Sequence, residues 1–126
     1  MVNGHVQIGE VAERTGLSLR TIRYYEEVGL VVPSARSQGG FRLYAESDIE
    51  RLGVIKRMKP LGFQLDEMRE LLGILDAAPD AESGQEQRRR LREFREKAEQ
   101  QCRSLREQLD IAEDFAATLR KRLAED

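Results

Sequence analysis

Short apolar repeats interrupted by glycine occupy the start of the chain and predict two short helices. The apolar positions of the first repeat recur at helical spacing: Ile8, Val11, Ala12 and Thr15. Gly16 is suited to the left-handed conformation that ends a helix. Ser18 is a good N-cap for a second helix over residues 19–28, which Gly29 ends. Two helices joined by so tight a turn form a helix-turn-helix pattern, although an ordinary helical hairpin would give the same spacing.

A short hairpin, or wing, is predicted after the second helix. Pro33 disfavours helix, and Gly39 and Gly40 are suited to positive φ at both central positions of a tight turn. A two-stranded wing fits this segment, with Arg36 before the turn and Arg42 after it.

Helical periodicity then returns in two further segments. A third helix is expected over residues 46–59, and Pro60 to Gly62 break it. Its predicted inward residues are Ile49, Leu52, Ile55 and Met58. A fourth helix over residues 65–75 has a predicted buried stripe of Leu65, Met68, Leu71, Leu72 and Leu75.

A long helix without Gly or Pro is predicted from residue 85 to the end of the chain. Ser83 and Glu86 suggest a capping box at its start, after a linker that contains Pro79. About 40 helical residues span roughly 60 Å, more than the diameter of a small domain. The predicted organisation is therefore a winged helix-turn-helix domain (1–75), a linker (76–83) and a dimerising helix (84–126), which is a mostly α fold.

The apolar residues of this long helix keep a seven-residue repeat. The first row is Leu91, Ala98, Leu105, Ala112 and Leu119; the second is Phe94, Cys102, Leu109, Phe115 with Ala116, and Leu123. A second copy of the helix is the natural partner for such a stripe, and we expect a coiled-coil homodimer. A single charged helix in water is the alternative, and the pattern leaves parallel and antiparallel pairing open. The Arg88–Arg90 and Arg120–Arg122 runs are interpreted as solvated faces because acidic residues flank both.

A DNA-reading surface is predicted on the second helix and the wing. Recognition helices read base edges with their N-terminal residues, so Arg20 is expected to contact guanine and Thr21 a thymine or phosphate. Arg23, with Tyr24 or Tyr25, is expected to bind phosphate, and Tyr25 is the better candidate for partial burial. The complete predicted set is Ser18, Arg20, Thr21, Arg23, Tyr24, Tyr25, Arg36, Arg42 and Tyr44.

The net charge of the whole chain argues against a nucleic-acid partner, but the charge of its first half is compatible with one. The 126 residues carry 21 basic and 23 acidic side chains, a net charge of −2. Residues 1–63 hold 9 basic and 7 acidic side chains, so the acidic excess lies entirely in the second half. The basic excess is small, and affinity is expected to depend on a few placed arginines and on dimerisation.

Several function classes are disfavoured by composition. One Cys and one His (Cys102 and His5) leave no disulfide within a chain and no plausible metal site or catalytic dyad, so no cofactor and no enzymatic activity are expected. No apolar run reaches the length of a membrane helix, and no leader opens the chain, so we expect a cytoplasmic, nucleoid-associated protein without a membrane partner.

Several linked motifs resemble the mercury-resistance-regulator (MerR) family of bacterial transcription factors. They are Ile8-Gly9-Glu10-Val11-Ala12, Gly16-Leu17-Ser18, Thr21-Ile22-Arg23-Tyr24-Tyr25-Glu26, Gly29-Leu30, Gly39-Gly40-Phe41-Arg42-Leu43-Tyr44 and Leu61-Gly62-Phe63. The resemblance is detailed over residues 6–75 and architectural over 84–126. It implies an antiparallel coiled-coil dimer on a dyad-symmetric operator in double-stranded DNA, acting with RNA polymerase by twisting and bending the promoter.

This sequence departs from the family in the residues and domains that bind the metal or small-molecule signal. Metal sensors of similar length keep a Cys near the start of the dimerisation helix and a Cys-containing loop after it. Ser83 and its neighbours stand at the first place, and residues 110–117 continue as predicted helix at the second. Soft-metal capture would need thiols that this chain lacks there. The large C-terminal domain of drug-binding and cobalamin-binding members is also missing from this sequence.

Three alternatives stay open beside a regulator without a recognisable sensor. Cys102 lies close to the middle of the predicted long helix, so two copies in an antiparallel pair would meet and form a thiol switch, although a small buried hydrophobe is the simpler interpretation. An architectural DNA-bending protein of the excisionase type shares the winged fold but usually lacks a dimer arm. An adaptor that uses the coil alone would leave the arginines of the first half unexplained.

Overall fold

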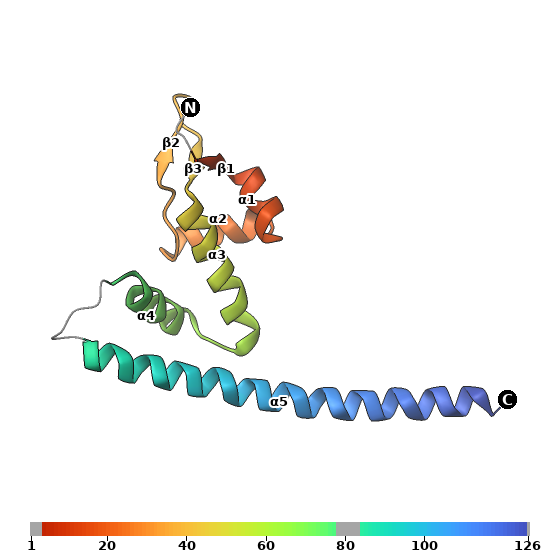
Figure 1. Cartoon of the computed structure of the whole chain (residues 1–126). Helices are drawn as coiled ribbons and strands as arrows, with labels where there is room; N and C mark the ends of the chain where they lie inside the picture. The colour runs from red at the N-terminus through yellow and green to blue at the C-terminus, as the bar shows by residue number, and fades with distance from the viewer. Residues whose placement is uncertain (1–3, 78–83, 126) are drawn as a thin grey trace. The chain divides into compact units, whose positions relative to one another are not determined.

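Contacts divide the computed structural model into two units, Met1–Ala78 and Pro79–Asp126. The structure describes residues 4–77 and 84–125 (Figure 1). The predicted capping box at Ser83 lies outside the described residues. The elements of the first unit are β1 (Val6–Gln7), α1 (Ile8–Thr15), α2 (Leu19–Glu27), β2 (Ala35–Arg36), β3 (Arg42–Tyr44), α3 (Glu46–Met58), η1 (Lys59–Leu61) and α4 (Leu65–Asp76). The second unit is α5 (Gly84–Ala124).

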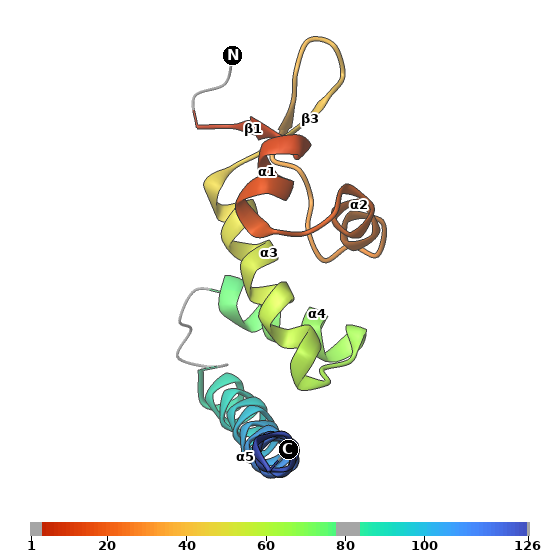
Figure 2. The ribbon, with the colours of Figure 1, turned by 90° about the vertical axis from the view of Figure 1, so that its right-hand side faces the viewer.

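Local capping signals set the helix-turn-helix as predicted. Gly16 ends α1 with a φ of 75° and donates from its N–H to the carbonyl of Ala12. Ser18 caps α2, because its hydroxyl oxygen accepts the N–H of Thr21 at 3.0 Å. The second helix ends at Glu27, one residue before the predicted end, and Gly29 follows with a φ of 80°. Figure 2 shows α1 and α2 as separate short helices joined by the turn.

The wing differs from the prediction in two ways. First, it is a three-stranded antiparallel sheet of order β1-β3-β2, because Val6 pairs with Tyr44 and Ala35 with Leu43. Second, Gly40 alone of the two turn glycines has a positive φ, 83°. The prediction of a tight turn with both glycines left-handed is therefore wrong.

A longer loop explains the turn geometry. The Gly40 N–H donates to the carbonyl of Ser37, and the Ser37 N–H donates to the carbonyl of Phe41, each at 2.9 Å. This pattern makes a three-residue loop in which one left-handed residue suffices. The loop extends away from the helices in Figure 2.

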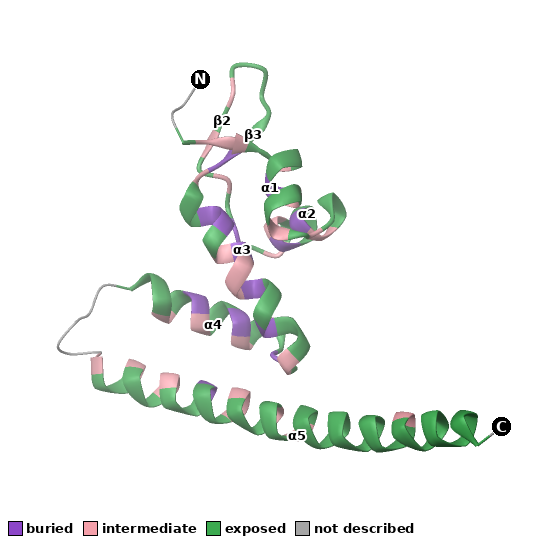
Figure 3. Ribbon diagram, turned by 45° about the vertical axis from the view of Figure 1, so that its right-hand side comes forward, coloured by how far each residue is buried: buried purple, intermediate pink, exposed green. Residues whose placement is uncertain are grey.

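The core of the first unit lies between the sheet and the helices. All four predicted inward residues of α3 are buried. Figure 3 shows buried positions along this helix. The α4 stripe is only partly confirmed: Met68 and Leu72 are buried, Leu65 and Leu71 are half-buried, and Leu75 is exposed. The prediction for Leu75 is wrong: this residue lies in the last turn of α4, and its side chain is 55% exposed. Other buried residues include Val11, Ile22, Tyr25, Leu30, Val31, Leu43 and Phe63.

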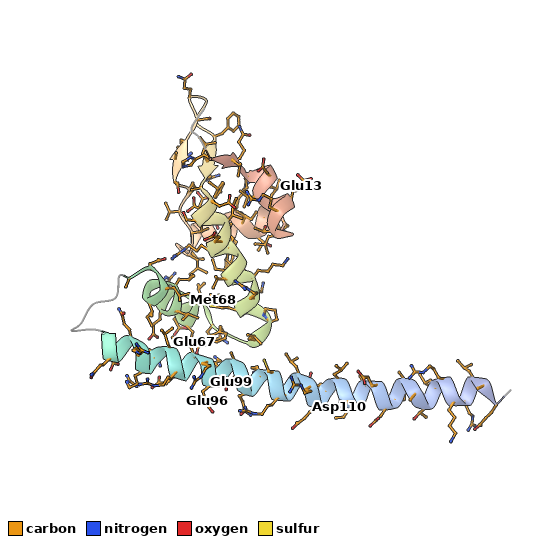
Figure 4. The ribbon with its side chains drawn as sticks, viewed as in Figure 1. Glu13, Glu67, Met68, Glu96, Glu99 and Asp110 are labelled. Carbon is orange, nitrogen blue, oxygen red and sulfur yellow. The ribbon has the colours of Figure 1, made fainter. Side chains whose placement is uncertain are left out.

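The second unit is one long helix with a highly charged surface. Exposed acidic side chains such as Glu96, Glu99 and Asp110 project from it (Figure 4). Within its first turns Arg89 pairs with Glu86 and Glu93, which supports the interpretation of this basic run as a solvated face.

Candidate nucleic-acid interface

The start of α2 presents exposed side chains in the way a recognition helix requires. Arg20 is exposed in the first turn, and Thr21 beside it is half-buried. The Ser18 hydroxyl donates to the Thr21 hydroxyl at 2.8 Å in addition to capping the helix. The Ser18 hydroxyl is therefore used in capping the helix. Arg20 takes no part in the cap, so it is the residue at this end of α2 that we expect to read a base.

Three of the predicted arginines come together around one pocket of about 220 Å³. Arg23 comes from α2, Arg36 from β2 and Arg42 from β3, and all three line the pocket. The other lining residues are Gln7, Ile8, Gly40 and Phe41, none of which is acidic. We call this site the arginine pocket. Three cations from three elements make it suited to a phosphate group of the DNA backbone.

Arg36 is fixed by the wing itself. Its Nη1 donates to the carbonyl of Gly40 at 3.0 Å, across the loop. Arg36 also stands opposite Arg42 in the strand register. Like charges directly opposite each other are unfavourable in a sheet, and a bound phosphate would relieve that repulsion.

A partly buried polar network connects α2 with β3. Glu26 forms an ion pair with Arg42, with 2.7 Å between Oε1 and Nε, and its Oε2 accepts from the Tyr44 hydroxyl at 3.2 Å. Burial, and secondarily the charge and hydrogen bond of Glu26, raise the pKa of Tyr44 to about 12. The network therefore joins the last turn of the recognition helix to the base of the wing.

Burial removes two tyrosines from the predicted surface. Tyr44 is 0% exposed and Tyr25 is 4% exposed, whereas Tyr24 is 47% exposed. The prediction that Tyr44 contacts DNA is wrong, because its ring fills the core and its hydroxyl binds Glu26. Tyr25 is buried, as the sequence favoured, and Tyr24 is the exposed tyrosine of the pair.

Phe41 is an interface candidate that the sequence reasoning missed. Its side chain is 64% exposed at the end of the wing, and it lines the arginine pocket. An apolar residue directly after a glycine turn and before an arginine was the available signal. An exposed ring at this place is suited to packing on sugar or base edges.

The predicted dimerisation residues lie on α5 with unequal exposure. Leu105, Leu109, Phe115 and Leu119 are each between 46% and 64% exposed, and Ala112 is exposed as well. Toward the start of the helix Leu91 and Ala98 are half-buried. Phe94 is buried, and the Arg90 guanidinium lies over its ring at 4.7 Å. Large exposed leucines at heptad spacing are typical of an unpartnered coiled-coil seam.

Cys102, a member of the second row of this stripe, is a free, exposed thiol. Across the part of the chain that the structure describes, no three His, Cys, Asp or Glu side chains cluster as metal ligands would. Within residues 4–77 and 84–125, no helix is both long and apolar enough to cross a bilayer.

Comparisons with known proteins match both halves of the chain to one family. Residues 6–73 match the family model described as MerR HTH family regulatory protein, and residues 49–113 match the one described as MerR, DNA binding. The mercuric resistance operon regulatory protein of Bacillus cereus is 46% identical over 70 residues, covering 56% of this chain and 53% of that protein. The matched part spans about half or less of the length of the curated relatives.

Solved structures extend the similarity to nearly the whole chain. The transcription regulator PbrR691 of Ralstonia metallidurans CH34, solved in complex with lead(II), is 32% identical with a TM-score of 0.60 over 92% of this chain and 86% of that one. HiNmlR, described as a MerR family regulator lacking the sensor domain and bound to promoter DNA, has a TM-score of 0.73 over 95% and 94% of the two chains. Its identity of 22% supports the shared fold alone.

Proposed function

This chain belongs to the MerR family of helix-turn-helix regulatory proteins, and from that premise we propose that it is a homodimeric, sequence-specific transcription regulator of promoter DNA. The observation that carries the proposal is the arginine pocket. It places cations of the recognition helix and of the wing around one site, next to an exposed Arg20 at the start of α2. Phosphate contacts of this kind fix the register in which a recognition helix reads bases.

The proposed partner for the α5 stripe is a second copy of the chain. Two recognition helices would then bind the two halves of a dyad-symmetric operator, as dimeric helix-turn-helix proteins do. Three or four phosphate contacts in each subunit give about six to eight in the dimer, which implies a steep dependence of affinity on salt. Each half-site alone would bind weakly, so dimerisation supplies most of the affinity.

The proposed mechanism is deformation of the promoter. A dimer that engages two half-sites with helices and wings would bend and twist the DNA between them, at a cost of about 1–10 kcal/mol that binding offsets. Such a distortion would realign promoter elements for RNA polymerase, which we propose as the partner at the promoter. The proposal is that of a non-enzymatic regulator acting on the nucleoid in the cytoplasm.

Genome-wide mapping of bound sites tests this function most directly. The expected result is a set of palindromic sites lying in promoters, with long spacers between the polymerase-binding elements. Bound sites at an integration locus would instead support the architectural, excisionase-like alternative. Absence of any enriched sites would contradict both and leave the coil-only adaptor.

A further inference from the structure

We infer that Glu26 is a positioning residue for DNA binding, which holds the wing guanidinium of Arg42 in the orientation that meets the phosphate backbone. This inference rests on the proposed function and adds an acidic residue to an otherwise basic interface. Glu26 lies in the last turn of α2, and its side chain is 16% exposed. Both of its oxygens have partners: Oε1 lies 2.7 Å from Arg42 Nε in an ion pair, and Oε2 accepts from the Tyr44 hydroxyl at 3.2 Å.

The geometry of the ion pair leaves Arg42 suited to a second anion. A guanidinium carries five N–H donors in a fixed planar fork, and Glu26 makes its ion-pair contact at the inner nitrogen, Nε. The two Nη groups lie at the other end of the fork and can donate to a phosphate. Arg42 is 42% exposed and lines the arginine pocket, so it faces both the carboxylate and the predicted DNA site. Holding the guanidinium in advance lowers the entropy cost of ordering it on binding.

The second partner of Glu26 is rigid, which makes the carboxylate a fixed support. Tyr44 is wholly buried, and it lies two residues after Arg42 in β3. Side chains two residues apart in a strand point to the same face, so Arg42 and Tyr44 approach one carboxylate from one face of the sheet. The Tyr44 hydroxyl stays a proton donor throughout the neutral range, because its pKa lies at about 12. Glu26 thereby ties the recognition helix to the wing.

A purely electrostatic role for Glu26 makes the opposite prediction. Whether neutralising Glu26 weakens or strengthens DNA binding therefore distinguishes a positioning role from a charge effect. A carboxylate near DNA repels phosphate, so its neutralisation should strengthen binding if Glu26 acts by charge alone. If Glu26 positions Arg42, neutralisation should weaken binding. Glu27, the next residue in the same helix, is exposed and provides a matched carboxylate without these partners.

The experiment measures affinity for a DNA duplex selected from a random-sequence pool by the purified 126-residue chain. Wild type, Glu26→Gln, Glu27→Gln, Arg42→Ala and the Glu26→Gln/Arg42→Ala double variant are compared by fluorescence anisotropy over a range of salt concentrations. We expect Glu26→Gln to weaken binding roughly tenfold, because the ion pair that holds Arg42 is lost, and to lower the salt slope toward that of Arg42→Ala. Glu27→Gln should bind as wild type or slightly tighter.

The double variant decides whether Glu26 acts through Arg42. With Arg42 removed, neutralising Glu26 should cause no further loss. The inference is overturned if Glu26→Gln binds as tightly as wild type or tighter, or if it weakens binding equally with and without Arg42. Urea unfolding of each variant identifies a loss due to misfolding, and Glu26→Asp, which keeps the charge, should then restore part of the affinity. Failure of wild type itself to prefer the selected duplex over a scrambled one would count against the proposed function instead.

Discussion

Arg51 in α3 forms an ion pair with Asp76, the last residue of α4, with 2.5 Å between Nη1 and Oδ2. The same guanidinium donates from Nε to the backbone carbonyl of Leu30, also at 2.5 Å. Leu30 follows the end of the recognition helix and is buried. One arginine therefore connects the segment after α2 with the end of α4. Arg69 of α4 adds a bond to the carbonyl of Val28, the residue that caps α2.

We expect Arg51→Ala to lower the free energy of unfolding by about 1.5–3 kcal/mol, the range for hydrogen bonds to charged groups. Leu30 loses its charged donor in a largely buried place, whereas Asp76 is 61% exposed and returns to water. Asp76→Ala should therefore cost less than about 1 kcal/mol. Urea unfolding at one fixed protein concentration measures both. Arg57→Ala is the control, because Arg57 is exposed and donates to Gly53 within its own helix.

The raised pKa of Tyr44 predicts that the free energy of unfolding falls at alkaline pH. Its pKa is about 12 in the folded chain and near 10 when unfolded, so the unfolded state loses this proton first as the pH rises. The resulting stability is complete below about pH 10 and is lost between about pH 10 and about pH 12. The difference in unfolding free energy between wild type and Tyr44→Phe should fall across that window. A difference that stays constant would contradict the assignment, since other tyrosines and lysines titrate equally in both proteins.

Arg20 and Arg42 are expected to affect DNA binding in different ways. Arg20→Ala should relax the preference at one base step and cost about 1–3 kcal/mol, because this side chain is placed to read a base edge. Arg42→Ala should weaken all sequences alike and reduce the salt slope by about one. Binding to a panel of single-base variants of the selected duplex, repeated at several salt concentrations, measures both. Equal loss of discrimination in the two variants would contradict these roles.

The helices of this fold were predictable because their signals are local. Ser18 caps α2 through a residue three positions away, and Gly16 ends α1 within one turn. The α3 stripe needed only helical spacing to predict which residues are buried. The same reasoning assigned DNA contacts to individual arginines of α2 and the wing, and those contacts stay a prediction.

Features that depend on distant partners were not predictable in this way. The strand β1 has two residues and thus no periodicity, and it exists because Val6 pairs with Tyr44. That pairing and the bond to Glu26 also explain why Tyr44 is buried. The arginine pocket was not predictable either, because it forms only where the wing lies next to α2 in the folded chain. Long-range contacts of this kind leave no mark in a short sequence window.

Leu105→Glu should separate the proposed dimer. Leu105 lies near the middle of α5 and is 46% exposed in the single chain. Its replacement by Glu would place a charge inside the coiled-coil seam. We expect a monomer in sedimentation experiments and a loss of most operator affinity, since a single half-site binds weakly. Gln100→Glu adds the same charge on the opposite, solvated face and should leave the dimer intact. A Leu105→Glu variant that remains dimeric would show that another surface forms the dimer.

Cys102 tests the thiol-responsive alternative, and we expect it to act as a small apolar residue. The thiol lies two residues from the middle of a helix that runs from Gly84 to Ala124, so an antiparallel pair would bring two copies near one another. It belongs to the second row of the apolar stripe together with Leu109 and Leu123, and a small thiol in such a row packs as an apolar residue. Mild oxidation followed by non-reducing electrophoresis should therefore give no covalent dimer, and Cys102→Ser should keep the DNA affinity of wild type. An oxidised dimer that forms readily in wild type, is absent in Cys102→Ser and has altered operator affinity would establish the switch.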